Sequence, residues 1–79
     1  MESDELLLLD VFTTHLKTKR LHSGMSQDKL SELSGVSIET ISRTENNKTN
    51  PLLTTFIQLA IVLEIDVNEI LEKYKQQTQ

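Results

Sequence analysis

Residues 27–46, QDKLSELSGVSIETISRTEN, have the features of two short helices joined by a tight turn. Gly35 stands where such a turn needs a positive φ, which glycine adopts without strain. Ser31 is small enough for two helices to cross closely, and Ser37 is placed to cap the second helix. Apolar anchors flank the turn at Leu30, Val36 and Ile41. This spacing is typical of a helix-turn-helix.

Helical periodicity continues on both sides of this motif, and five helices are predicted. Their approximate bounds are residues 4–22, 26–33, 37–45, 51–63 and 66–74. Residues 62–67 also alternate between apolar and polar as a strand would, but no second strand is predicted to pair with them. We therefore predict an all-α fold, a compact bundle of five helices.

The start of the last helix carries a recognisable pattern. Asp66 and Glu69 have the spacing of a capping box. In that arrangement Asp66 accepts a hydrogen bond from the helix, and the Glu69 side chain reaches back to the backbone before it. We expect both interactions.

Length and composition exclude several classes of protein. Seventy-nine residues permit one domain, predicted over residues 1–75 with a polar tail at residues 76–79. The absence of cysteine excludes disulfides and thiolate chemistry. His15 and His22 are interpreted as surface residues too far apart to share a metal ion. The sequence therefore predicts a cytoplasmic protein that is not an enzyme, binds no metal or cofactor and does not enter a membrane.

The net charge of -4 is unevenly distributed. Residues 17–50 carry six basic and four acidic residues, a net charge of +2. Residues 1–16 carry four acidic residues and no lysine or arginine, and residues 51–79 carry two basic and four acidic residues. Because the local potential decides where a polyanion binds, the middle segment is the predicted site for a phosphate backbone.

Residues 24–51, GMSQDKLSELSGVSIETISRTENNKTNP, followed by FIQLAIVLEIDVNEIL, resemble the Xre/Cro-type family of lambda-repressor-like helix-turn-helix domains. The resemblance includes the Glu-Asn-x-Lys exit from the motif and the two trailing helices in order. It implies a sequence-specific DNA-binding transcriptional regulator that acts as a homodimer on a palindromic operator, as a repressor or autoregulator. Phage and plasmid repressors and restriction–modification controller proteins share this architecture.

The same resemblance implies roles for individual residues. The helix over residues 38–45 would enter the major groove. There Ile38 would contact a thymine methyl, Glu39 would accept from a cytosine amino group, and Arg43 would bind guanine O6 and N7. Gln27 would contact a phosphate or brace the recognition helix. Further contacts to bases or phosphates would come from Ser37, Thr40, Ser42, Asn46, Asn47, Lys48 and Thr49.

Other positions implied by the resemblance are structural. Arg20 and Glu45 stand where many relatives form a partly buried ion pair that ties the first helix to the recognition helix. Ile38 and Glu39 replace the glutamines that some phage repressors use, and three structural positions also depart from the family pattern. Thr44 replaces isoleucine or leucine, Leu52 replaces a serine or threonine cap, and Glu64 replaces a glycine that ends a helix.

Two alternatives remain open at this point. Glu39 and Arg43 are four residues apart, so they can instead form an ion pair within one helix. Apolar residues beyond the needs of one small core predict a homodimer interface built from Ile57, Ile61, Ile65 and Tyr74, with Leu7 and Val11 as further candidates. The alternative is that the first helix packs against the last two helices of the same chain.

A second function also fits the sequence. Acidic flanks and surplus apolar residues are compatible with an antitoxin-like or regulatory module that uses this fold to hold another protein. Its partner would be a cognate protein, and RNA polymerase is a further candidate partner for a regulator. For the DNA-binding regulator, the predicted partners are double-stranded operator DNA and a second copy of the chain.

Overall fold

The computed structural model describes residues 2–46, 48 and 50–78, with the side chains of residues 7–46, 48 and 50–77. The helices are α1 (Glu2–His22), α2 (Gln27–Ser34), α3 (Ile38–Glu45), α4 (Leu53–Leu63) and α5 (Val67–Thr78). The described residues contain no strand, so the all-α prediction is confirmed. Within residues 62–67, residues 64–66 form the turn between α4 and α5, and the others belong to these helices.

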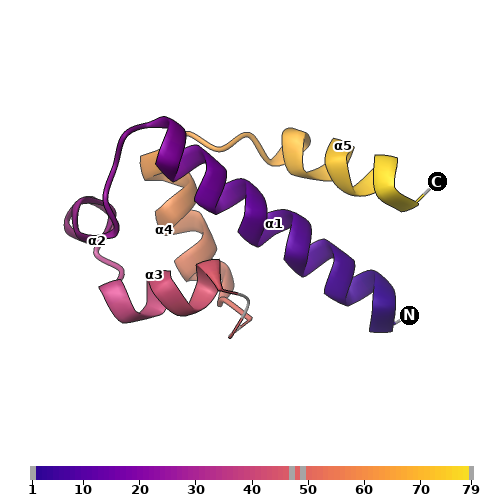
Figure 1. Cartoon of the computed structure of the whole chain (residues 1–79), viewed down its shortest axis with the longest axis horizontal. Helices are drawn as coiled ribbons and strands as arrows, with labels where there is room; N and C mark the ends of the chain where they lie inside the picture. Colours follow the sequence, from indigo (N-terminus) through magenta and orange to yellow (C-terminus); the bar gives the residue numbers. More distant parts are fainter. Residues whose placement is uncertain (1, 47, 49, 79) are drawn as a thin grey trace.

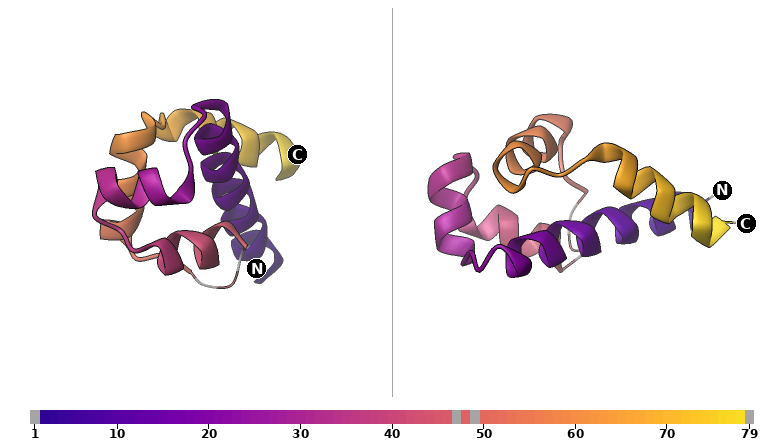
Figure 2. Two further views of the ribbon diagram at one scale, coloured as in Figure 1. Left: turned by 60° about the vertical axis from the view of Figure 1, so that its left-hand side comes forward. Right: turned by 90° about the horizontal axis from the view of Figure 1, so that it is seen from above.

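The long helix α1 organises the molecule. Helices α3 and α4 pack against it, α2 packs against α3 and α4, and the N-terminal half of α1 extends beside α5 (Figure 1). Both chain ends lie at the same end of the long axis, which measures 37 Å (Figure 2). Residues 76–78, which belong to the polar tail predicted at residues 76–79, continue α5 as helix. Glutamine favours helix, which is consistent with Gln76 and Gln77 extending α5 while their side chains stay exposed.

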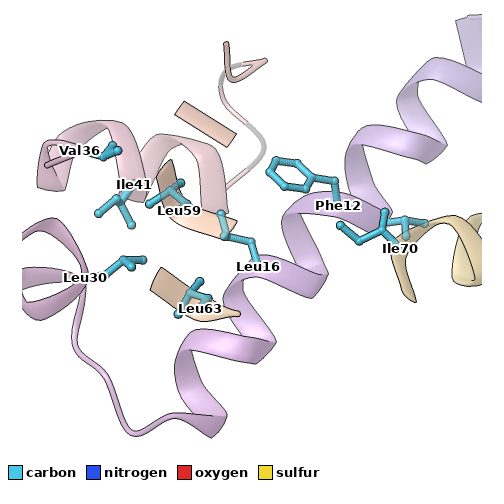
Figure 3. Close-up of a cluster of buried hydrophobic side chains, with 9 residues drawn as sticks. Phe12, Leu16, Leu30, Val36, Ile41, Leu59, Leu63 and Ile70 are labelled. Atoms are coloured by element: carbon cyan, nitrogen blue, oxygen red, sulfur yellow. The ribbon is translucent and has the colours of Figure 1, made fainter. Parts of the chain in front are cut away.

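One hydrophobic core contains side chains from every helix (Figure 3). Leu16 of α1, Leu30 of α2, Ile41 of α3 and Leu59 of α4 are fully buried in it. The remaining members are Val11, Phe12, Val36, Leu63 and Ile70. Because the same cluster holds α2, α3 and the turn between them, it fixes the helix-turn-helix relative to α1 and α4.

The first helix buries more of its surface than its own periodicity indicates. Val11, a candidate for the dimer interface, is a core residue and is therefore not available to a second chain. Leu7 is partly buried against the same core. The core of a single chain therefore accounts for the burial of both side chains.

Local signals set the ends of the motif helices as predicted. Ser26 and Ser37 precede α2 and α3, and each side chain accepts a hydrogen bond from the backbone N–H three residues later, at 3.0 and 3.1 Å. Gly35 follows α2 in the left-handed conformation, with a φ of 80°. Serine caps and a left-handed glycine thus produce the sharp change of direction between the two helices.

The three departures from the family pattern have visible structural consequences. Glu64 ends α4 with a φ of 53°, a left-handed conformation that glycine adopts at lower cost. Leu52 precedes α4 and provides no side-chain cap. Thr44 is fully buried, and its hydroxyl has no hydrogen-bond partner among the described residues. Each feature lowers the free energy of unfolding relative to the usual residue.

The capping box predicted for α5 is correct only in part. Asp66 Oδ1 accepts a hydrogen bond from the Asn68 N–H at 2.9 Å. The Glu69 carboxylate lies instead 3.6 Å from Lys19 Nζ on α1. Because α5 packs along α1, a cation on that helix becomes the nearest partner for Glu69.

The predicted surface position of His15 is wrong, because α5 covers this side of α1 and buries the ring. Lys73 Nζ of α5 lies 3.1 Å from Nδ1, whereas Nε2 has no hydrogen-bond partner among the described residues and is 3.9 Å from Glu69 Oε1. Burial lowers the pKa of His15, nearby Lys73 and Lys19 lower it further, and Glu69 opposes them. The neutral ring is therefore part of the contact between α1 and α5.

We expect acid to destabilise the protein through His15. Its pKa is lower in the folded chain than the ordinary value of 6.5. The neutral ring therefore contributes stability that is fully present above 6.5 and is lost as the pH falls below it. His15→Gln keeps a neutral acceptor for Lys73 and should lose less stability between about pH 7 and about pH 5, as measured by urea unfolding.

The exposed histidine gives the matched control for this measurement. His22→Gln changes a side chain that is open to solvent and should retain the acid loss of the unmodified chain. Equal acid losses in the two variants would show that burial of His15 is not the cause.

Candidate nucleic-acid interface

Helix α3 presents one face to the core and the opposite face to solvent. Ile41, Thr44 and Glu45 are buried. The opposite face carries the exposed residues Ile38, Glu39, Arg43 and Asn46 and the partly exposed Ser42. Neighbours in this set are one, three or four residues apart in the sequence, so they lie on one side of the helix. In Figure 1 and in the left view of Figure 2, α3 lies at the edge of the bundle, and no other helix covers its outer side there. A groove of a duplex can therefore approach this face.

An ion pair with α1 fixes the end of α3. Arg20 Nε and Nη2 donate to the two carboxylate oxygens of Glu45 at 2.7 and 3.0 Å. The Arg20 and Glu45 side chains are only 9% and 1% exposed. Paired, parallel hydrogen bonds between charged groups are the strongest that these side chains form. The structure thus brings together the two residues expected to tie α1 to the recognition helix.

Two further hydrogen bonds complete this network. Arg20 Nη1 donates to the Met25 carbonyl at 2.8 Å, and Gln27 Nε2 donates to Glu45 Oε1 at 3.0 Å. Gln27 therefore braces α3 in the free chain, one of its two expected roles, while its contact with a phosphate stays a prediction. The Met25 carbonyl was missed at the sequence level, because a backbone acceptor leaves no trace in the side-chain pattern.

Two of the expected DNA contacts already interact with each other. Ser37 Oγ donates to Thr40 Oγ1 at 2.8 Å and also accepts from the Thr40 N–H. These hydroxyls hold the first turn of α3 in shape. To bind a base or a phosphate, either hydroxyl must give up one of these hydrogen bonds. Ser37 and Thr40 therefore stabilise the first turn of α3 in addition to any contact with DNA.

The two charged residues on the outer face of α3 do not pair with each other. No ion pair joins Glu39 and Arg43 in the part of the chain that the structure describes, so the intrahelical pair considered from the sequence is absent. Both side chains are exposed. A carboxylate and a guanidinium therefore stand available on the face that would meet a base edge.

The segment after α3 folds back toward the helix. The Lys48 N–H donates to the Arg43 carbonyl at 2.8 Å. This bond keeps exposed Lys48 close to the end of α3, beside exposed Asn46. The expected contacts from Asn47 and Thr49 fall outside the described residues.

Comparison with known proteins matches residues 16–70 to the helix-turn-helix family. The chain belongs to that family. Among solved structures, it is similar to a mutant of the restriction–modification controller protein C.Esp1396I, with a TM-score of 0.76 and 25% identity over 90% of this chain and 92% of that chain. No curated protein matches the sequence.

The family and the fold support a DNA-binding transcriptional regulator of the Xre-like helix-turn-helix type and not an enzyme. In the described part of the chain, no helix has the length and apolar character of a membrane span. For this helix-turn-helix protein, the outer face of α3 is the candidate contact surface for DNA.

Removing Glu45 should destabilise the protein strongly. Glu45→Ala leaves the buried Arg20 charge without its partner, a change that costs about 3–5 kcal/mol. Unfolding in urea, followed by circular dichroism, measures the loss. Glu32→Ala is the control, because it breaks an exposed pair with Lys29 whose side chains are 70% and 56% exposed. That loss should stay below about 1 kcal/mol, and similar losses for both variants would contradict a structural role for the buried pair.

Proposed function

We propose that the chain binds double-stranded operator DNA with α3 in the major groove. The observation that carries this proposal is that α3 is anchored on its inner face while its outer face stays uncovered. In this arrangement Arg43 binds a guanine through O6 and N7, and Ser42 and Thr40 supply short hydroxyl donors. Gln27, Ser37, Asn46 and Lys48 lie around α3 and contact the phosphate backbone.

The active form in this proposal is a homodimer on a palindromic operator. Helix α4 carries no charged residue, and its Ile61 side chain is 71% exposed. Ile57 is exposed beside it, and Ile65 and Tyr74 are partly buried. An uncharged apolar face does not repel its own copy. Two symmetric recognition helices then bind two half-sites, which raises both affinity and specificity.

The proposed outcome of binding is repression in the cytoplasm, including repression of the chain's own promoter. A regulator of this kind occupies its operator in proportion to its concentration, so synthesis slows as the protein accumulates. In this proposal the bound protein either excludes RNA polymerase from the same promoter or contacts it there.

Arg43 and Lys48 should affect DNA binding differently. Arg43→Ala should lower affinity for the operator by about 1–3 kcal/mol and leave binding to a scrambled duplex nearly unchanged. Lys48→Ala should weaken both complexes alike and reduce the slope of log K against log salt by about 1. Fluorescence anisotropy with labelled duplexes at several salt concentrations measures both effects. Equal losses on the two duplexes for Arg43→Ala would remove its proposed role in reading a base.

The apolar face of α4 should control the oligomeric state. Ile61→Asp places a charge in the proposed interface and should shift the chain from dimer to monomer in sedimentation equilibrium, with weaker operator binding. Leu21→Asp is the control, since Leu21 on α1 is 56% exposed and lies outside this face.

An unmodified chain that is monomeric and ignores DNA sequence, yet forms a discrete complex with a cognate protein, would favour the antitoxin-like function instead.

A further inference from the structure

The first turn of α3 presents an apolar and an acidic side chain at consecutive positions. Ile38 is 44% exposed, and Glu39 beside it is also exposed. Neither side chain has a polar partner among the described residues. Both side chains occupy the end of α3 nearest to the base edges in the proposed complex.

Glu39 restricts which base can lie opposite it. A carboxylate between two phosphate backbones is repelled unless it accepts a hydrogen bond. The N-terminus of α3, where Glu39 lies in the first turn, offsets part of this repulsion through the helix dipole. In the major groove the base-edge donors are the amino groups of cytosine and adenine. Glu39 therefore requires one of these two bases.

Ile38 adds a second requirement. An apolar side chain in the major groove gains most from a methyl group, and the methyl groups there are carried by C5 of pyrimidines. C4 and C5 are bonded neighbours, so a pyrimidine presents its C4 and C5 substituents side by side. Thymine has the methyl group, but its O4 acceptor opposes a carboxylate. Cytosine has the amino group without the methyl group, and 5-methylcytosine has both.

We propose that Ile38 and Glu39 together read one cytosine in each half-site, and that methylation of this cytosine at C5 strengthens binding. The inference rests on the proposed binding of α3 in the major groove. Consecutive side chains diverge by about 100° around a helix, so both reach one base only when the longer Glu39 side chain turns toward Ile38. The rotatable bonds of Glu39 let its carboxylate turn toward the base that Ile38 touches. The chain then acts as a sensor of cytosine methylation in its operator.

The test separates the amino group from the methyl group. A preferred duplex is first selected from a random pool with the unmodified chain. Each pyrimidine of the half-site is then replaced in turn by cytosine, 5-methylcytosine, uracil or thymine, each with its complementary purine. At one position per half-site, 5-methylcytosine should bind about fourfold more tightly than cytosine, the value for burying one methyl group. Uracil there should bind at least about fivefold more weakly than cytosine.

Two variants assign the effects to side chains. Ile38→Ala should bring the ratio of 5-methylcytosine to cytosine affinities close to one while keeping the preference for cytosine over uracil. Glu39→Gln should do the reverse, because an amide can also donate to O4 of uracil. Leu21→Ala removes a comparably exposed apolar side chain from α1 and should leave both ratios unchanged.

The outcomes distinguish this inference from the function on which it rests. Equal or weaker binding of 5-methylcytosine at every position overturns the inference, as does a methyl effect that survives Ile38→Ala. In either case the selected duplex is still bound, and the proposed function stands. If the random pool yields no preferred duplex, sequence-specific binding itself fails and the inference fails with it.

Discussion

The orientation of α3 depends on the buried contact between Arg20 and Glu45. This contact joins the C-terminal part of α1 to the last residue of α3 through two hydrogen bonds, while Gln27 adds a third bond to the same carboxylate. Removing two charges from water is costly, and this geometry offsets the cost because both carboxylate oxygens and all three guanidinium nitrogens are engaged.

The hydrophobic core and the ion pair position α3 by different means. Leu16, Leu30, Ile41 and Leu59 hold the inner face of the helix-turn-helix by non-directional burial. Apolar packing alone tolerates small rotations of a short helix. The directional bonds at Glu45 fix its rotation, so the same side chains always face outward. A surface that contacts base edges needs side chains in fixed positions, because displacement of a contacting side chain costs much of its binding energy.

The sequence predicted those features that depend on neighbours along the chain. Serine caps at Ser26 and Ser37 and the left-handed turn at Gly35 follow from local backbone chemistry, and each formed as expected. The inward and outward faces of α3 follow from its periodicity. Local rules of this kind were sufficient to recognise the five helices and the orientation of the motif.

Errors arose where a distant helix changed the surroundings of a residue. His15 becomes buried because α5 packs along α1, and Val11 because it belongs to the shared core; no pattern within α1 reveals either. Glu69 exchanges a local backbone partner for Lys19 because α5 packs along α1. The pairing of Arg20 with Glu45, 25 residues apart, was expected only from family resemblance, since spacing does not identify such long-range partners.

The shared direction of the two chain ends has a practical consequence. Both emerge at the opposite end of the long axis from α2 and α3 (Figure 2). A fluorophore or reporter domain attached at either end would therefore stand well away from α3. Tethered probes of this kind would allow binding of a duplex to be followed with the proposed contact surface unobstructed.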